Sequence, residues 1–387
     1  MIKKISSLIA FVFSFTPLLA FSQLPATIGR ADNSEWAQGL IDATEDKHLR
    51  PVVQIGTLRN QGNSVKFIHH CTGVVVSESK ILTSAYCFES GSDGKPIFEN
   101  MVVIKAKKNN ANHNNKYYVS TEDLRMDLVY REVTSVVVNP TYNMSKLNAF
   151  GKNNPGNLAI ITMHKPMLWI KPIRIANKAT IDMMEVGDRP VRMAGFTLLQ
   201  IKSQSWYFRA SRFFDKRLFS FDNYRTLSPD QCQEITKKYV DQDAVPGFSF
   251  ETSFDKSEYG GVAQSQICTI SPTIRSCTGE AGSPLLLMDD RGRYELIGIA
   301  SWGMGSFVDN VKRPFESAPV TCSYPRDPES QYIGSRLGYP YLGPRVFNKE
   351  TPAQSLVPAI TVFEKPTAFA DWIQANAGID YSIDYPK

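Results

Sequence analysis

The chain has 387 residues and a formal net charge of +5, and 42% of its residues are hydrophobic and 11% aromatic. This balance excludes disorder on a large scale and indicates neither nucleic acid nor an acidic surface as a partner. The length suffices for one large domain or for two barrels side by side.

Residues 1–22 predict an export signal. The stretch "MIKKISSLIAFVFSFTPLLAFS" places Lys3 and Lys4 before an apolar run, with small residues for signal peptidase at its end. Removal of these two lysines takes the net charge from +5 to +3. The run is short for a bilayer span and contains a proline, so a retained anchor is the weaker alternative, and no other run could cross a membrane. We expect a secreted or periplasmic chain, cleaved after Ala20 or Ser22, with no membrane span in its mature form.

Most of the mature chain has the pattern of short strands between turns. A strand, a turn and a strand are predicted at 71–85, a further strand at 157–163, and a hairpin at 283–303 with Asp290 and Gly292 in its turn. This pattern predicts an all-β barrel or sandwich.

Two helices interrupt the strand pattern. At 228–239, Ser228 is the predicted N-cap and Pro229 the first helical residue. At 367–378, Thr367 is the predicted N-cap and Gly378 the end. One face of this second helix is apolar and carries Phe369, Trp372 and Ile373.

Three segments are predicted as long loops, at 106–118, 202–219 and 304–342. The second is basic and aromatic, and it contains Lys202, Trp206, Arg209, Arg212, Lys216 and Arg217. Binding of an anionic glycan, membrane or nucleic acid is one interpretation. Because Asp215 and Asp222 interrupt the run, ordinary solvated charges are favoured and no nucleic-acid partner is expected.

The six cysteines are even in number, which in an exported chain indicates disulfide bridges. Their spacing leaves the pairing open, and it does not match a zinc site, so neither a metal nor a cofactor is predicted. They are Cys71, Cys87, Cys232, Cys268, Cys277 and Cys322.

Four motifs resemble the chymotrypsin and trypsin-like serine proteases, over a core from about Pro51 to Gly378. "CTGVVVSESKILTSAYCF" resembles the segment that ends Ala-Ala-His-Cys in the family, and "VVVNPTYN" with "GNLAIITM" resembles the one that reads Asp-Ile-Ala-Leu. "CTGEAGSPLLL" resembles the Gly-Asp-Ser-Gly-Gly-Pro loop, and "GIASWG" the strand along which substrate lies.

The resemblance implies one trypsin-like peptidase domain over 23–387, built of two six-stranded antiparallel β-barrels with the active site between them and a C-terminal α-helix. It also implies the disulfide pairs Cys71–Cys87, Cys232–Cys268 and Cys277–Cys322.

The same resemblance places substitutions at all three catalytic positions. Tyr86 falls where the family has histidine, Asn157 where it has aspartate and Ala281 where it has the nucleophilic serine. A phenol with a pKa of about 10 is not a base near neutral pH, an amide carries no charge, and a methyl group cannot attack. Ser283 lies two residues on, roughly 6 to 7 Å away along an extended chain, which is too far to replace the missing hydroxyl.

The resemblance also assigns positions around the substrate. Gly279 falls where an oxyanion-hole amide lies, or is a glycine that a tight loop requires. Arg275 falls at the base of the primary specificity pocket and Arg345 in its wall, unless both arginines point to solvent. Gly303 keeps an edge that an extended peptide can meet.

Activation by cleavage is not expected. Glu280 replaces the aspartate that pairs with the new N-terminus in the family, and Leu40 rather than a basic residue precedes Ile41. His69 matches a position that contacts the same carboxylate in precursors, with a packed histidine as the alternative.

Two functional hypotheses follow. The favoured one is a monomeric, exported serine protease homologue without peptidase activity that binds a protein or peptide, as a decoy, an inhibitor trap or a cofactor. The alternative is a secreted serine-type endopeptidase with a displaced catalytic group, which requires a serine or threonine within hydrogen-bond reach of a histidine in the cleft.

Overall fold

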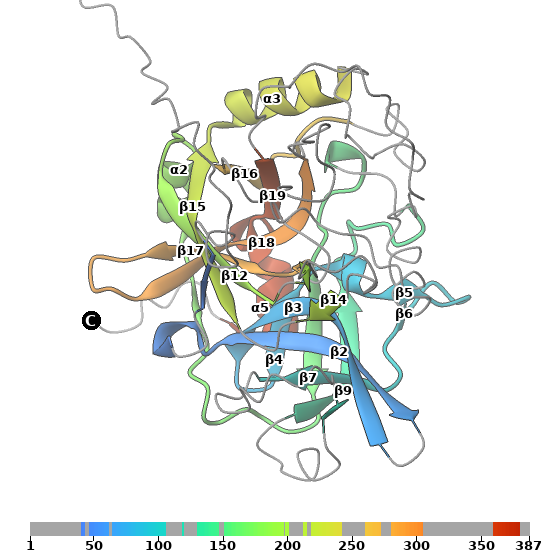
Figure 1. Ribbon diagram of the computed structural model, residues 1–387. Coiled ribbons are helices and arrows are strands. Elements are labelled where there is room, and N and C mark those ends of the chain that lie inside the picture. Colours follow the sequence, from blue (N-terminus) through green and yellow to red (C-terminus); the bar gives the residue numbers. More distant parts are fainter. Residues whose placement is uncertain are drawn as a thin grey trace, which may run out of the picture.

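Two closed barrels of antiparallel strands organise the chain (Figure 1). The computed structural model describes residues 40–42, 46–61, 64–105, 118–119, 130–146, 151–196, 198–200, 212–214, 218–241, 260–271, 280–304 and 359–379. In Figure 1, strands β2, β4, β7 and β9 of the first barrel lie below, and β15, β16 and β19 of the second lie above.

The first barrel closes through six strands, since β2 pairs with both β7 and β3. In spatial order they are β2 (Val52–Gln61), β7 (Met101–Ile104), β9 (Tyr130–Val138), β10 (Ala159–Met163), β4 (Lys80–Thr83) and β3 (Ser64–Ser77). The short strand β8 (Tyr118–Val119) adds to β3.

The second barrel closes in the same way, because β15 pairs with both β12 and β16. Its strands in spatial order are β15 (Phe219–Leu227), β12 (Pro190–Gly195), β17 (Pro284–Met288), β18 (Tyr294–Met304), β19 (Ala359–Glu364) and β16 (Gln266–Ser271). Strand β1 (Leu40–Asp42) extends this sheet antiparallel to β15, and β11 (Arg174–Ile175) pairs parallel with β18. The prediction of two six-stranded antiparallel barrels is confirmed.

Strand alternation explains how one sequence serves two cores. Successive side chains of a strand point to opposite faces. Val75 accordingly packs inside the first barrel, whereas Val74 and Val76 join a second cluster that also contains Leu286 and Leu296 of the second barrel. The valines of "CTGVVV" thus contribute both to the core of the first barrel and to the apolar contact between the two barrels.

Helices are few and short in the described part of the chain. They are α2 (Lys178–Met184), α3 (Pro229–Asp241) and α5 (Ala370–Ala377), with 3₁₀ turns η2 (Lys47–Leu49), η3 (Ala85–Cys87), η4 (Gly151–Asn153) and η6 (Pro366–Phe369). Helix α5 buries Ile373 in the cluster between the barrels, with Phe369 and Trp372 packed against it, as its apolar face predicts.

The predicted ends of the helices are confirmed with one correction. Ser228 caps α3 reciprocally with Gln231, and Gly378 ends α5 in the left-handed conformation at φ 67°. Thr367 is wrong as the cap of α5: it lies inside the turn η6, which runs directly into the helix, and no side chain caps that helix.

The predicted loops contain strand residues, which corrects the sequence interpretation. Tyr118 pairs with Lys66 through β8, and β14 (Arg212–Phe214) forms a hairpin with β13 (Leu198–Gln200). A further hairpin joins β5 (Glu89–Ser90) and β6 (Pro96–Ile97). Helix α2, capped by Asn177, was not predicted either.

Two of the three implied disulfides are confirmed. Cys71–Cys87 joins β3 to η3, and Cys232–Cys268 joins α3 to β16. Each is worth roughly 2 to 4 kcal/mol of stability on a chain-entropy account. Cys277 and Cys322 lie outside the described residues, as do the export signal 1–22 and most of the three long loops.

Candidate functional site

A one-turn 3₁₀ helix presents Tyr86 beside a disulfide. Ser84 is the N-cap of η3, and its Oγ accepts a hydrogen bond from the Tyr86 N–H at 3.3 Å. The bridge from Cys87 to Cys71 fixes the other end of the turn. The Tyr86 side chain is buried, with 7% of its surface exposed. The cap and the bridge together set the backbone position of Tyr86.

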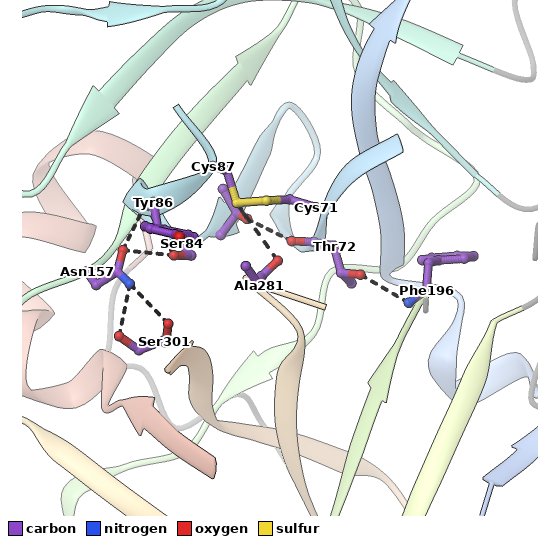
Figure 2. Close-up of a disulfide and its surroundings, with 10 residues drawn as sticks. Cys71, Thr72, Ser84, Tyr86, Cys87, Asn157, Phe196, Ala281 and Ser301 are labelled. Atoms are coloured by element: carbon purple, nitrogen blue, oxygen red, sulfur yellow. Dashed lines mark hydrogen bonds between the residues drawn. A yellow bond between two sulfur atoms is a disulfide. The ribbon is translucent and has the colours of Figure 1, made fainter. Parts of the chain in front are cut away.

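Asn157 links this turn to the second barrel (Figure 2). Its Oδ1 accepts from the Tyr86 N–H at 2.9 Å and from the Ser84 hydroxyl at 2.8 Å. Its Nδ2 donates to Ser301 Oγ at 2.9 Å, on strand β18. Because the Tyr86 N–H can only donate, the atom that it meets must be the amide oxygen, and this fixes which end of the amide faces Ser301.

The backbone before Asn157 requires glycine. Gly156 has φ 76°, and a Cβ there would lie 2.0 Å from Thr141 Oγ1. Only glycine adopts this conformation without strain in so little space. The turn therefore fixes the direction in which Asn157 enters the site.

The loop that carries Ala281 is held against the first barrel. The Ala281 carbonyl accepts from the Thr72 N–H at 3.0 Å, and the Ala281 side chain packs on the apolar core of the first barrel. Thr72 Oγ1 in turn accepts from the Phe196 N–H at 3.1 Å. Figure 2 shows Ala281 close to the Cys71–Cys87 bridge, so Tyr86, Asn157 and Ala281 all lie around one junction of the two barrels.

Ser283, the nearest hydroxyl along the chain, is fully buried with 0% of its surface exposed. A Cβ placed on Gly195 would lie 2.2 Å from Ser283 Oγ, which shows how tightly the hydroxyl packs against β12. It has no hydrogen-bond partner within the described part of the chain. A group this enclosed cannot reach a substrate.

Glu364 is a buried carboxyl that the sequence analysis missed. It ends β19 with 0% of its surface exposed and accepts from Gln266 Nε2 at 2.6 Å, from Ser265 Oγ at 3.1 Å and from Ser301 Oγ at 3.5 Å. Burial raises its pKa to about 7, although these hydrogen bonds oppose the shift. Its burial could have been predicted from strand alternation, because Glu364 lies on the same face of the strand as Ile360 and Val362.

Glu280, the expected activation carboxylate, is 1% exposed. It lies near Tyr224 of β15: burial is the main cause that raises the pKa of the Tyr224 phenol, and the charge of Glu280 adds to it. His69 is also buried, and its ring lies 6.2 Å from that of Phe196 and 6.4 Å from that of Phe67. This aromatic packing favours the packed-histidine interpretation of His69.

The candidate activation segment lies in a sheet. Leu40 pairs with Phe221, Ile41 with Ser220 and Asp42 with Phe219 on the edge of the second barrel. Ile41 is therefore held as the middle residue of an edge strand.

Strand β18 has an edge that no described strand covers. Its residues Trp302 and Gly303 pair with β19 on one side, whereas its pairing with β17 begins only at Ile299. The Ala281 loop continues the contact to Ala300, whose N–H donates to the Ser283 carbonyl. Gly303 lies on this stretch of β18, and its role as an edge that an extended peptide can meet stays a prediction.

One threonine lies beside a histidine in the first barrel. Thr57 Oγ1 and His70 Nε2 are 2.9 Å apart on the neighbouring strands β2 and β3. Both residues are half-buried.

Gly279, Arg275 and Arg345, together with the bridge Cys277–Cys322, lie outside the described residues. Their assigned roles stay predictions. Within the described ranges, no group of three or more histidine, cysteine or acidic residues is arranged to hold a metal ion. No helix among the same residues is long and apolar enough to cross a membrane.

Comparison with known proteins agrees with this architecture. The family described as Trypsin matches residues 221–320, a range that includes Ala281 and the strand β18. Transmembrane protease serine 11G of Rattus norvegicus is 19% identical over 249 residues, which is 64% of this chain and 46% of that protein. Vitamin K-dependent protein C of Rattus norvegicus is 21% identical over 274 residues, 67% of this chain and 48% of that protein.

The chain thus spans a little under half the length of these relatives. The two closed barrels, the confirmed disulfides Cys71–Cys87 and Cys232–Cys268 and the terminal helix are features that the resemblance to this family implies. At the level of the family, the corresponding activity is that of a serine-type endopeptidase. The chain is similar to the chymotrypsin/trypsin-like serine proteases, through the family match over residues 221–320 and through these relatives.

Proposed function

We propose that the protein is an exported serine protease homologue that lacks peptidase activity and acts by binding another protein. The observation that carries this proposal is the methyl group of Ala281 at the place that resembles the nucleophile position. A methyl group has no lone pair with which to attack a peptide carbonyl. Loss of a whole catalytic triad reduces turnover by a factor on the order of 10⁶.

The neighbours of Ala281 support the same proposal. Tyr86 offers a phenol in place of an imidazole, and Asn157 offers a neutral amide in place of a carboxylate. Ser283 does not replace the missing hydroxyl because it is fully buried.

Hydrolysis of fluorescein-labelled casein tests the loss of activity. We expect no release of fluorescence above background at enzyme concentrations 10⁴ times those at which trypsin gives a clear signal, because the expected loss is on the order of 10⁶. A Gly303→Glu variant prepared in parallel is the control for a co-purified protease, because such a contaminant would give the same activity in the wild-type and variant samples. Hydrolysis proportional to wild-type concentration and reduced in the variant would refute the proposal.

The binding surface that we propose lies along β18 at Gly303, on the side of the strand that no described strand pairs with there. An extended peptide can add to such an edge as a further strand, with its main chain supplying the hydrogen bonds. This chemistry suits a protein partner with an exposed extended loop, such as a reactive-loop inhibitor of trypsin-like proteases. A homologue that binds such an inhibitor without cleaving it would act as an inhibitor trap.

Two substitutions of one residue test the edge. A Cβ at Gly303 would lie 3.0 Å from the Ile360 carbonyl, so Gly303→Ala needs a shift of a few tenths of an ångström and serves as the matched control. Gly303→Glu adds a charged chain to the same Cβ. In calorimetric titrations with purified reactive-loop inhibitors we expect Ala to change the Kd less than threefold and Glu to weaken binding more than tenfold. Equal effects of the two substitutions would contradict binding along this edge.

The contact between Thr57 and His70 favours a second candidate, an endopeptidase with a displaced nucleophile. A hydroxyl within hydrogen-bond reach of an imidazole is the first requirement of such a site. The pair lies on strands β2 and β3 of the first barrel, however, whereas the family's nucleophile loop comes from the second. We therefore favour a structural hydrogen bond for Thr57. Casein hydrolysis that disappears in Thr57→Val and persists in Gly303→Glu would establish this second candidate instead.

Export is part of the proposal. The pattern of residues 1–22 predicts a signal peptide, and the two disulfides fit an oxidising compartment, outside the cell or in a periplasm. N-terminal sequencing of the exported chain tests it, with Phe21 or Gln23 as the expected first residue and Met1 as the contradicting result.

A further inference from the structure

A single buried carboxyl serves the polar network between the barrels. Glu364 receives hydrogen bonds from three residues of the second barrel, namely Gln266 of β16, Ser265 before it and Ser301 of β18. The backbone N–H groups of Gly156 and Asn157 reach it from the first barrel. All five are neutral donors, which suits an acceptor-only carboxylate.

No charged side chain is among the partners that the described residues give to Glu364. The neighbouring Lys365 pairs with Glu185 instead. The charge of Glu364 is therefore offset only by neutral dipoles, and a second negative charge nearby would have no cation to balance it.

Asn157 and Glu364 are linked through Ser301 by hydrogen bonds whose donors all face toward Glu364. Asn157 Nδ2 donates to Ser301 Oγ, so the single proton of the Ser301 hydroxyl remains for Glu364 Oε1. An aspartate at position 157 has no proton to donate. Ser301 would then face two carboxylates with one proton, and one of the two would lose its hydrogen bond from Ser301 inside the protein.

We propose that Asn157 and Glu364 are a matched pair, in which the carboxyl at 364 requires an amide at 157 and together they orient Ser301 on strand β18. Glu364 is in this account a positioning residue, which acts through Ser301. This proposal goes beyond the proposed function and does not rest on it, since it concerns the stability of the network and not peptidase chemistry.

A double-mutant cycle tests the pairing in the full exported chain. The variants are Asn157→Asp, Glu364→Gln and the double variant, and the readout is the equilibrium constant for unfolding in urea at pH 8. We expect Asn157→Asp alone to raise the unfolding constant at least tenfold, because it places a second carboxylate in the network. Glu364→Gln in that background should lower it again at least tenfold, because one carboxylate is then left, now at 157.

Asn154→Asp is the matched control. Asn154 is a buried amide of the same connection, and its hydrogen bonds go to Asn143 and Lys146. We expect its effect and that of Glu364→Gln to combine additively, within twofold. If Asn154→Asp were coupled to Glu364→Gln as strongly as Asn157→Asp is, the coupling would reflect general destabilisation and the proposed pairing would be wrong.

A pH series gives a readout that a merely structural role would not move. The destabilisation by Asn157→Asp should grow as the pH rises from 5 to 8, since both carboxyls then ionise, and the double variant should lose this growth. Additive effects of Asn157→Asp and Glu364→Gln, or a pH-independent loss, would overturn the proposal and leave the casein result untouched.

The proposal can also be tested if Asn157→Asp folds poorly. Recovery of folded protein from the double variant, where the single variant yields none, supports the pairing. If the double variant is equally unrecoverable while Glu364→Gln alone folds, the amide at 157 is needed for another reason and the proposal fails.

Discussion

Substitution of Gly282 by alanine is expected to cost about 3 kcal/mol of folding free energy. Gly282 has φ 82°, and a Cβ there would lie 2.1 Å from Thr83 Oγ1 and 2.2 Å from the Thr72 carbonyl. The left-handed backbone costs a residue with a Cβ roughly 1 to 2 kcal/mol, and overpacking adds about 1 to 3 kcal/mol. The loss of folding free energy measures how closely the Ala281 loop packs against the first barrel.

Gly292→Ala separates these two costs. Gly292 has φ 70° in the turn between β17 and β18, and its Cβ would meet nothing within 4 Å. We expect this control to lose only the backbone term, about 1 kcal/mol in urea unfolding. If the two variants were equally stable, the close packing of the Ala281 loop would be wrong.

Folding stability should fall as the pH rises from 4.5 to 7, through the ionisation of Glu364. Burial raises the pKa of this carboxyl from 4.5 to about 7 in the folded protein. Between these values the unfolded chain binds fewer protons than the folded one, so each step up in pH favours unfolding. The stabilisation is complete below pH 4.5 and lost above pH 7, and it amounts to about 3 kcal/mol.

Glu364→Gln is the measurement for this effect. We expect the unfolding free energy of wild type minus that of the variant to decrease by about 3 kcal/mol between pH 4.5 and 8. Contributions from other titrating groups cancel in this difference. One such group is Lys105, because burial lowers its pKa to about 7. A difference that stayed constant over this range would contradict a buried, ionisable Glu364.

The two effects describe one junction, in which the polar groups of Asn157 and Glu364 are hydrogen-bonded to neutral partners. The Asn157 amide uses its oxygen for Tyr86 and Ser84 and its nitrogen for Ser301. Fully hydrogen-bonded buried networks rigidify the structure around them.

The fold was predictable because its signals are local and repeated. The valines 74–76 before a turn predict a strand, and Gly292 between two apolar runs predicts a hairpin. Ser228 and Pro229 predict the start of a helix in the same local way. Thr367 failed because Pro366 starts a 3₁₀ turn, and the sequence has no separate signal for such a turn before a helix.

The candidate site was predictable only in part, since its network is made by residues far apart in the chain. The positions of Tyr86, Asn157 and Ala281 follow from motif order, and the structure brings them to one junction (Figure 2). Glu364 comes 207 positions after Asn157, and no local pattern says that Ser301 lies between them. Only the closed pairing of β18 with β19 brings this carboxyl to the site.

Labelling with a fluorophosphonate, read by intact-protein mass, tests the absence of an activated nucleophile most directly. The reagent forms an adduct with a serine or threonine hydroxyl only where a nearby base activates it. The account predicts an unchanged mass for the mature chain under conditions in which trypsin is completely modified. A stoichiometric adduct, mapped by peptide mass spectrometry to Ser283, Thr57 or any other hydroxyl, would contradict it.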